Sequence, residues 1–191
     1  MGQYDFTTRP NRLNQFTYKW QASENDPDLL QLWVADMDFF PVPTIKEAII
    51  NYGQEHIFGY NYAKDSLYQA VIYWEKKEHG YAISKEDIAF IDGVVPAISV
   101  AIQAFTQKGD AVLINSPVYY PFARTVRLND RKLVENSLLI RNGHFEIDFE
   151  QLEKDIEDNE VKLYIFCSPH NPGGRVWSKE ELQKIGDLCA K

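Results

Sequence analysis

Apolar residues recur at helical spacing in two segments of the first half of the chain, residues 43–57 and 64–80. Pro43 favours a helix start in the first segment, and Gly80 favours a helix end after the second. The residues that share the apolar faces are Ile45, Ala48, Ile49, Tyr52, Leu67, Ala70, Val71 and Trp74. The spacing therefore predicts two amphipathic helices separated by the loop FGYNYA, residues 58–63.

The pattern changes in the second half, where short apolar runs alternate with helical patterns. The runs cover residues 87–91, 111–115 and 161–168; the helical patterns cover residues 96–108, 146–158 and 178–191. Strands that are apolar throughout and alternate with helices indicate an α/β fold, a mostly parallel sheet flanked by helices. Ligands of such sheets bind at the carboxyl ends of the strands. We therefore expect residues 92–97, 115–122 and 168–174 to meet at one edge of the sheet.

The two ends of the chain differ from this core pattern. The first forty residues are irregular but carry too many aromatic residues for a solvated tail, which predicts an ordered arm. At the other end, Ser178 and Glu181 form a capping-box pattern, and the helical spacing then runs to Lys191 without a following strand. A crossover helix normally leads to another parallel strand. We therefore expect the sequence to be part of a longer protein.

Composition narrows the function classes. The chain has 191 residues and a formal net charge of −8, and it has no basic stripe, which argues against a nucleic-acid partner. No apolar run is long enough to span a bilayer, the N-terminus lacks a signal-peptide pattern, and Phe6 breaks the myristoylation pattern. The cysteines, Cys167 and Cys189, form no disulfide framework, so a cytoplasmic location is expected.

Three strand-end segments carry candidate chemistry. Gly93 precedes a helix predicted to begin near Pro96, and such a helix start suits phosphate, although an ordinary strand-to-helix turn is the better interpretation of this segment by itself. Tyr119 follows the next run and can lie over a flat aromatic ligand, or pack a helix start. Asn171 precedes a proline, so its amide can project from the third strand end. We interpret His170 beside it as a solvated loop histidine.

Asp36 and Asp38 form a pair of acids in the segment LWVADMDFF, residues 32–40. Paired carboxylates can bind a metal, but no further ligands stand at metal-binding spacing, so no metal site is expected. A loop whose acids cap backbone N–H groups is at least as good an interpretation as a binding role.

Taken together, WVADMDF, GYN, GVVPAI, SPVYYPF and PHNPGGRVW resemble the fold-type I pyridoxal-phosphate enzymes of the aminotransferase class I/II family. The closest resemblance is to its cystathionine β-lyase-like branch of C–S lyases. The resemblance implies that residues 43–191 are the N-terminal part of the large cofactor-binding domain. It also implies that residues 1–42 are an arm belonging to the small domain and the edge of the active site.

The resemblance also implies roles for individual residues. Backbone N–H groups of Val94 and Val95 would hold the phosphate of pyridoxal 5'-phosphate, Tyr119 would stack on its ring, and Asn171 would bind the ring's phenolic oxygen. Tyr60 would reach the phosphate in the neighbouring subunit of a homodimer. The three weaker assignments are Ala35 and Asp36 beside the amino-acid substrate and Tyr120, a tentative catalytic residue, near the leaving group.

The implied reaction is β-elimination at the C–S bond of cystathionine- or cysteine-type amino acids, which releases a thiol, pyruvate and ammonia. The family's Schiff-base lysine and the aspartate that pairs with the pyridine nitrogen have no match in these residues, so this chain alone is expected to be inactive. An aminotransferase on the same scaffold and a non-catalytic regulatory relative remain alternatives.

Overall fold

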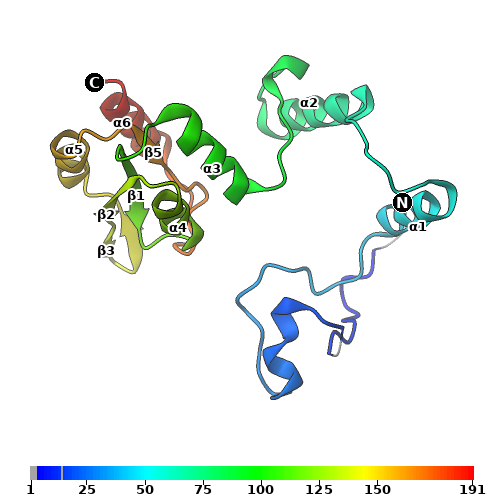
Figure 1. The fold of residues 1–191 in the computed structure, drawn as a ribbon. Coiled ribbons are helices and arrows are strands. Elements are labelled where there is room, and N and C mark those ends of the chain that lie inside the picture. Colours follow the sequence, from blue (N-terminus) through cyan, green and yellow to red (C-terminus); the bar gives the residue numbers. More distant parts are fainter. Residues whose placement is uncertain (1–3, 14) are drawn as a thin grey trace. The chain divides into compact units, whose positions relative to one another are not determined.

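The computed structural model describes residues 4–13 and 15–191, and the chain separates into two compact units (Figure 1). The first unit covers Met1–Tyr68 and the second covers Gln69–Lys191. The predicted division into residues 1–42 and 43–191 concerns the domains of the whole enzyme and stays a prediction.

The first unit is largely irregular, as its sequence predicts. Two short 3-10 helices, η1 (Tyr18–Trp20) and η2 (Ala22–Glu24), precede the helix α1 (Pro43–Glu55). Aromatic side chains pair within the arm: the ring centroids of Tyr18 and Trp33 lie 4.9 Å apart. The arm is thus held by ring packing and local polar contacts instead of by regular secondary structure.

The helix α2 (Asp65–His79) begins at the end of the first unit and ends where the sequence predicts. Gly80 adopts a left-handed φ of 65°. Its N–H donates to the carbonyl of Lys76 and the N–H of Tyr81 donates to that of Glu75, both at 3.1 Å. This pairing satisfies carbonyls that a helix end leaves free, which explains the stop at glycine.

The second unit contains a parallel three-stranded sheet in the order β2-β1-β5 and an antiparallel hairpin of β3 and β4. Its strands are β1 (Ala111–Ser116), β2 (Lys132–Ser137), β3 (Leu139–Arg141), β4 (His144–Glu146) and β5 (Leu163–Ile165). Its helices after α2 are η3 (Lys85–Asp87), α3 (Val94–Phe105), α4 (Pro121–Leu128), α5 (Phe149–Asp158) and α6 (Lys179–Cys189).

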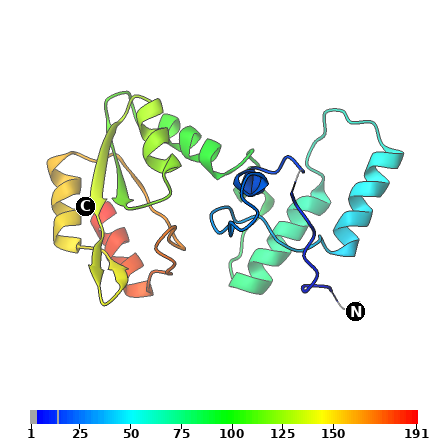
Figure 2. The ribbon, with the colours of Figure 1, turned by 90° about the horizontal axis from the view of Figure 1, so that it is seen from below.

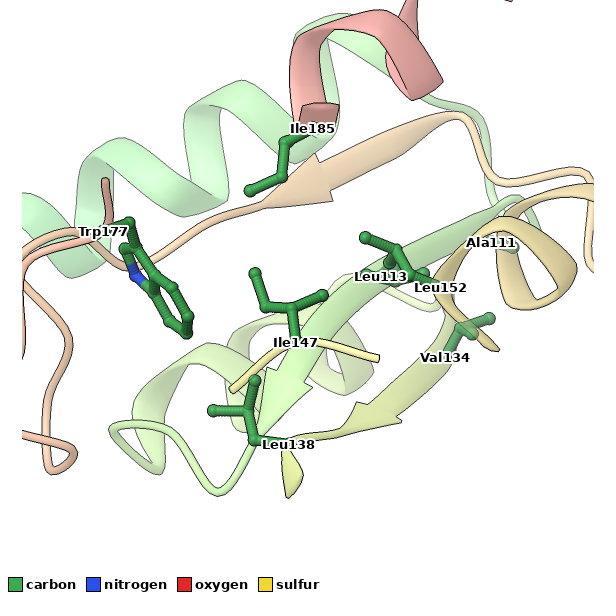
Figure 3. Close-up of a cluster of buried hydrophobic side chains, with 8 residues drawn as sticks. All are labelled: Ala111, Leu113, Val134, Leu138, Ile147, Leu152, Trp177 and Ile185. Atoms are coloured by element: carbon green, nitrogen blue, oxygen red, sulfur yellow. The ribbon is translucent and has the colours of Figure 1, made fainter. Parts of the chain in front are cut away.

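Helices cover both faces of this sheet, which confirms the predicted fold class. On one face Ile102 of α3 and Val126 of α4 pack on Val112 of β1. On the other face Leu113 of β1 lies in a cluster with residues of α5 and α6, whose side chains converge in Figure 3. Figures 1 and 2 both show α5 on one side of the sheet and α4 on the other. Successive residues of β1 point to opposite faces, as strand geometry requires, so the positions from Ala111 to Ile114 are all apolar.

Three details differ from the sequence-based expectation. The strand predicted over residues 87–91 is wrong: in the described chain, residues 88–91 pair with no strand, and the sheet consists of β2, β1 and β5. The helix predicted from Pro96 begins two residues earlier, at Val94, since proline is tolerated within a first turn. The strand predicted over 161–168 narrows to Leu163–Ile165.

The described residues include no helix of sufficient length and apolar character to traverse a membrane.

Candidate functional site

Two of the three predicted strand-end segments meet. Strands β1 and β5 are parallel neighbours, so the segments that follow them emerge at the same edge of the sheet. The backbone N–H of Tyr119, after β1, donates a 2.9 Å hydrogen bond to the carbonyl of Asn171, after β5. This bond joins the ring and the amide that the sequence singles out into one local structure.

The third segment forms the start of α3. Gly93 has a φ of 129°, and no side chain caps the helix N-terminus that follows it. The connection of residues 106–110 leads α3 directly into β1, so the helix runs against the strand and begins toward the edge where β1 ends (Figure 1). Val94 is exposed and Val95 half-buried. The first-turn N–H groups are thus available to an anion, with the helix dipole adding to the attraction.

The two tyrosines after β1 differ in how firmly they are held. Tyr119 is 41% exposed, and its ring meets Phe122 at a centroid distance of 6.3 Å. Tyr120 is 72% exposed and forms the N-cap of α4, with its ring centroid 5.4 Å from that of Tyr119. Tyr119 therefore has one side supported by protein and enough free ring surface to cover a flat ligand.

Asn171 is fixed by its backbone. Its N–H donates to the sulfur of Cys167 at 3.4 Å, while its carbonyl accepts from Tyr119. Its side chain is exposed, and no hydrogen bond to the amide is found within the described residues. The anchored backbone leaves the amide free to donate to a ligand, as a ring-oxygen contact requires.

His170 corrects the sequence-based interpretation, because it is buried and not solvated. Its exposure is 3%, and its ring packs edge-on against Trp177 and beside Phe145. Its Nδ1 accepts the N–H of Gly173 at 3.0 Å. Burial, with a smaller contribution from the positive charge of Arg175, holds the pKa of His170 below its ordinary 6.5. The imidazole is a structural part of the Asn171 turn.

Arg175 ties this turn to its surroundings and has no counterpart in the sequence-based expectations. Its guanidinium donates to the carbonyl of Phe145 and to the carboxylate of Glu181, both at 2.5 Å. It also lies over the ring of Trp177, 4.1 Å from the centroid. The guanidinium thus joins the β3–β4 hairpin, the turn and the start of α6. The sequence around Arg175 indicates this structural role only once the fold is known.

A buried polar chain lies on the α5 side of the same strands. Asn115 donates to the Asn136 side chain at 2.9 Å, and Asn136 donates to the Asp155 carboxylate at 2.8 Å. The hydroxyl of Tyr164 donates to the Asn115 oxygen. Burial raises the pKa of Tyr164 well above its ordinary value, so the phenol stays protonated. Because these buried polar side chains are hydrogen-bonded to one another, they fix the register of β1, β2 and β5.

The remaining predicted residues lie in the first unit. Tyr60 protrudes fully into solvent, and Ala35 is exposed. The Asp36 carboxylate pairs with Arg12 at 3.0 Å. Asp38 pairs with the buried amine of Lys19, also at 3.0 Å. Both carboxylates therefore bind side-chain cations, not the backbone N–H groups that the capping interpretation expects.

Ala35 and Asp36 contribute to the wall of a cleft of about 470 Å³ in this unit, which the amine of Lys19 also lines. Within the part of the chain that the structure describes, no group of three or more His, Cys, Asp or Glu residues is arranged to hold a metal ion.

The second unit is a parallel α/β structure whose strand-end loops present the ring of Tyr119 and the amide of Asn171, a kind of site suited to a flat ligand. The profile of the aminotransferase class I and II family matches residues 27–191. The chain belongs to this family.

Its relatives include C–S lyases. Over 188 residues it is 43% identical to the cystathionine β-lyase PatB of Bacillus subtilis, an alignment that covers 97% of this chain and 49% of that protein. Cystalysin from Treponema denticola, whose structure contains pyridoxal 5'-phosphate, matches with 40% identity and a TM-score of 0.91, over 99% of this chain and 49% of that one. The pyridoxal-phosphate-bound C–S lyase of Staphylococcus hominis matches with 32% identity and a TM-score of 0.87, over 98% and 48%. The chain spans about half the length of these relatives.

The residues present fit pyridoxal phosphate. The cofactor needs an anion site, a surface for its ring and a donor for its phenolic oxygen. The uncapped start of α3, the partly exposed ring of Tyr119 and the unpaired amide of Asn171 supply these three features on one unit.

Proposed function

We propose that the full-length protein is a pyridoxal-phosphate-dependent C–S lyase that acts on cystathionine- or cysteine-type amino acids. The observation that carries this proposal is the hydrogen bond between Tyr119 and Asn171, which joins the ring-stacking and amide functions at one sheet edge. The 43% identity to a cystathionine β-lyase and the 40% identity to cystalysin support this branch over an aminotransferase. We propose that the full-length protein acts in the cytoplasm.

The chain's own groups would hold the cofactor in one plane. The N–H groups of Val94 and Val95 would bind the phosphate, and the ring of Tyr119 would cover one face of the pyridine. The Asn171 amide would donate to the phenolic oxygen. Bound pyridoxal phosphate withdraws electrons from the substrate's Cα, which permits loss of the Cα proton and of the thiolate at Cβ. The products are a thiol, pyruvate and ammonia.

The exposed groups would act around this centre. Ala35 and Asp36 would border the amino-acid end of the substrate, and Tyr120, which has 72% of its surface free, would stand near the leaving thiol. Tyr60, which is fully exposed, would contact the cofactor phosphate of the second subunit, as the family resemblance implies. We therefore propose a homodimer as the active form.

The proposal concerns the whole enzyme. None of the lysines in these 191 residues matches the family's Schiff-base motif, so we propose that these residues alone release no pyruvate. Pyruvate formation by the isolated 191-residue chain would contradict this.

The test compares two reactions of the full-length protein. We expect stoichiometric thiol and pyruvate release from L-cystathionine, and much slower transfer of its amino group to a 2-oxo acid. Transfer without thiol release would favour an aminotransferase instead. Absence of both reactions in protein that binds pyridoxal phosphate would favour a non-catalytic relative.

A matched pair of variants tests the site without relying on activity. Tyr119→Phe keeps the ring and should bind pyridoxal phosphate nearly as well as the wild type. Tyr119→Leu removes the ring and should weaken binding by about fivefold, the equivalent of roughly 1 kcal/mol of aromatic stacking. Cofactor absorbance during titration measures both. Equal binding by the two variants would show that the ring of Tyr119 does not contact the cofactor.

A further inference from the structure

His170 is the chain neighbour of Asn171 and is not used by the proposed function. It is 3% exposed and immediately precedes Asn171. Its backbone closes a tight turn: its N–H donates to the carbonyl of Arg175 at 2.8 Å, and its carbonyl accepts the N–H of Gly174 at 2.9 Å. The imidazole then folds back onto the same turn, where Nδ1 accepts the N–H of Gly173.

The hydrogen bond to Gly173 defines the state of the ring. An imidazole nitrogen accepts a hydrogen bond only when it carries no proton, so Nδ1 is bare and the neutral ring carries its proton on Nε2. Nε2 is buried, and no partner for it exists within the described residues. The ring therefore contributes to the turn through the lone pair of Nδ1 and through its packing.

The packing around His170 leaves no space for its ring in another position. A Cβ placed on Gly173 would come within 2.4 Å of His170 Nδ1 and 3.0 Å of the Phe145 ring. Trp177 packs against the imidazole at a ring-centroid distance of 5.7 Å. Adding a proton to Nδ1 would turn two hydrogen-bond donors toward each other at 3.0 Å, and the ring cannot rotate away without disturbing its neighbours.

The charges around the ring increase this effect. Arg175, in the same turn, places a guanidinium over Trp177 and adds to the cost of a charged imidazole. Glu181 of α6 is bound to Arg175 and offsets part of that charge. The strand β4 carries His144, which is exposed, and Glu146, which pairs with Arg141 at 3.7 Å. Within the described residues no carboxylate hydrogen-bonds to His170 itself, so nothing there compensates for a proton on its ring.

We propose that His170 is a positioning residue that holds Asn171 in its ligand-binding conformation only while the imidazole is neutral, so that affinity for pyridoxal phosphate falls on acidification. The inference rests on the proposed function. Asn171 lies between the two backbone bonds of His170 and the 2.9 Å bond to Tyr119, so opening the turn at Gly173 displaces the amide. We call the hydrogen bond from the Gly173 N–H to His170 Nδ1 the latch. Above pH 6.5, the ordinary pKa of histidine, the imidazole is neutral whether the latch is formed or open, so the latch has its full strength. Below it the open state binds a proton that the latched state excludes, so the latch weakens as pH falls.

The test uses the full-length protein, pyridoxal phosphate as the probe, and two substitutions. His170→Asn places an oxygen acceptor near the position of Nδ1 but cannot titrate. His170→Phe keeps the ring volume without an acceptor. Affinity is measured by cofactor absorbance at about pH 8 and about pH 5.5, on either side of the ordinary histidine pKa.

We expect the wild type to lose about tenfold more affinity between these pH values than His170→Asn, the equivalent of one hydrogen bond. His170→Phe should bind about tenfold more weakly than the wild type at the higher pH. An acid-side loss in His170→Asn equal to that of the wild type would overturn the proposal, as would wild-type affinity in His170→Phe.

A measurement on the wild type covers the case in which the variants do not fold. Nitrogen-15 spectra of labelled histidine should show an unprotonated, hydrogen-bonded Nδ1 and a protonated Nε2 for His170 at neutral pH. The opposite tautomer, or a charged ring, would refute the latch. A wild-type protein that binds no pyridoxal phosphate at the higher pH would refute the proposed function, and these spectra would then decide the latch by themselves.

Discussion

Replacing Gly173 by alanine gives a sharp test of how the Asn171 turn is packed. The new Cβ would lie 2.4 Å from Nδ1 of His170, closer than Cβ atoms approach other atoms, and 3.0 Å from the ring of Phe145, which is a tight contact. The imidazole cannot move outward, because it is buried and rests on Trp177. The turn itself must therefore shift.

The cost has two parts. Overfilling a packed site costs about 1–3 kcal/mol. Loss of the 3.0 Å bond from the Gly173 N–H to His170 adds about 1 kcal/mol. We expect Gly173→Ala to lower the free energy of unfolding by about 2–4 kcal/mol, and the midpoint of thermal unfolding to fall with it.

The chain provides a matched control with the opposite sign. Gly186 lies inside α6 on an exposed surface, and a Cβ there would meet no atom within 4 Å. Alanine is the better helix former, so Gly186→Ala should stabilise the protein by up to about 1 kcal/mol. Circular dichroism melting of the full-length protein and both variants checks the pair. If Gly173→Ala melts with the wild type while Gly186→Ala melts above it, the packing of the turn is not as described.

Three further predictions concern groups around the site. Arg175→Lys should cost about 1–2 kcal/mol of stability in chemical denaturation, because an ammonium cannot make both 2.5 Å bonds and stack on Trp177; unchanged stability would contradict this. Asn136→Leu should cost about 2–4 kcal/mol by the same measurement, since it removes the acceptor of the Asn115 amide and the donor to Asp155 Oδ2; a neutral effect would refute the buried polar chain. Above pH 10, unfolding releases the Tyr164 proton that the folded state retains, so stability should fall as pH rises, and Tyr164→Phe should flatten that fall; parallel pH profiles would count against it.

The sequence predicts the elements whose partners lie near in the chain. The strand β1 is apolar from Ala111 to Ile114 because helices cover both its faces, and this continuity is readable without a structure. The capping box at Ser178 is also local: Ser178 accepts the N–H of Glu181 at 3.2 Å, and the Glu181 carboxylate accepts the N–H of Ser178 at 2.7 Å. Both features depend only on spacing along a few residues.

The strands whose pairing is distant or partial were not predictable in the same way. In the sequence of β2, KLVENS, only Leu133 and Val134 are apolar, so it lacks the continuous apolar run that indicates a buried strand. Conversely, residues 87–91 have such a run without a partner strand in the described chain. Apolar character favours burial of a segment. Whether the buried segment forms a strand depends on a neighbouring strand that pairs with its backbone groups.

The residues of the candidate site likewise differ in how far the local sequence predicts them. Tyr119 and Asn171 could be singled out because strand-end turns are marked by their own prolines and glycines. His170 could not, because its burial depends on Phe145, which is 25 positions away in the printed sequence and arrives through the β3–β4 hairpin. The same hairpin supplies the carbonyl that Arg175 binds. The residues expected to touch the ligand are therefore readable from local pattern, whereas the contacts that fix their geometry depend on long-range packing, which is also where substitutions should have their largest effects.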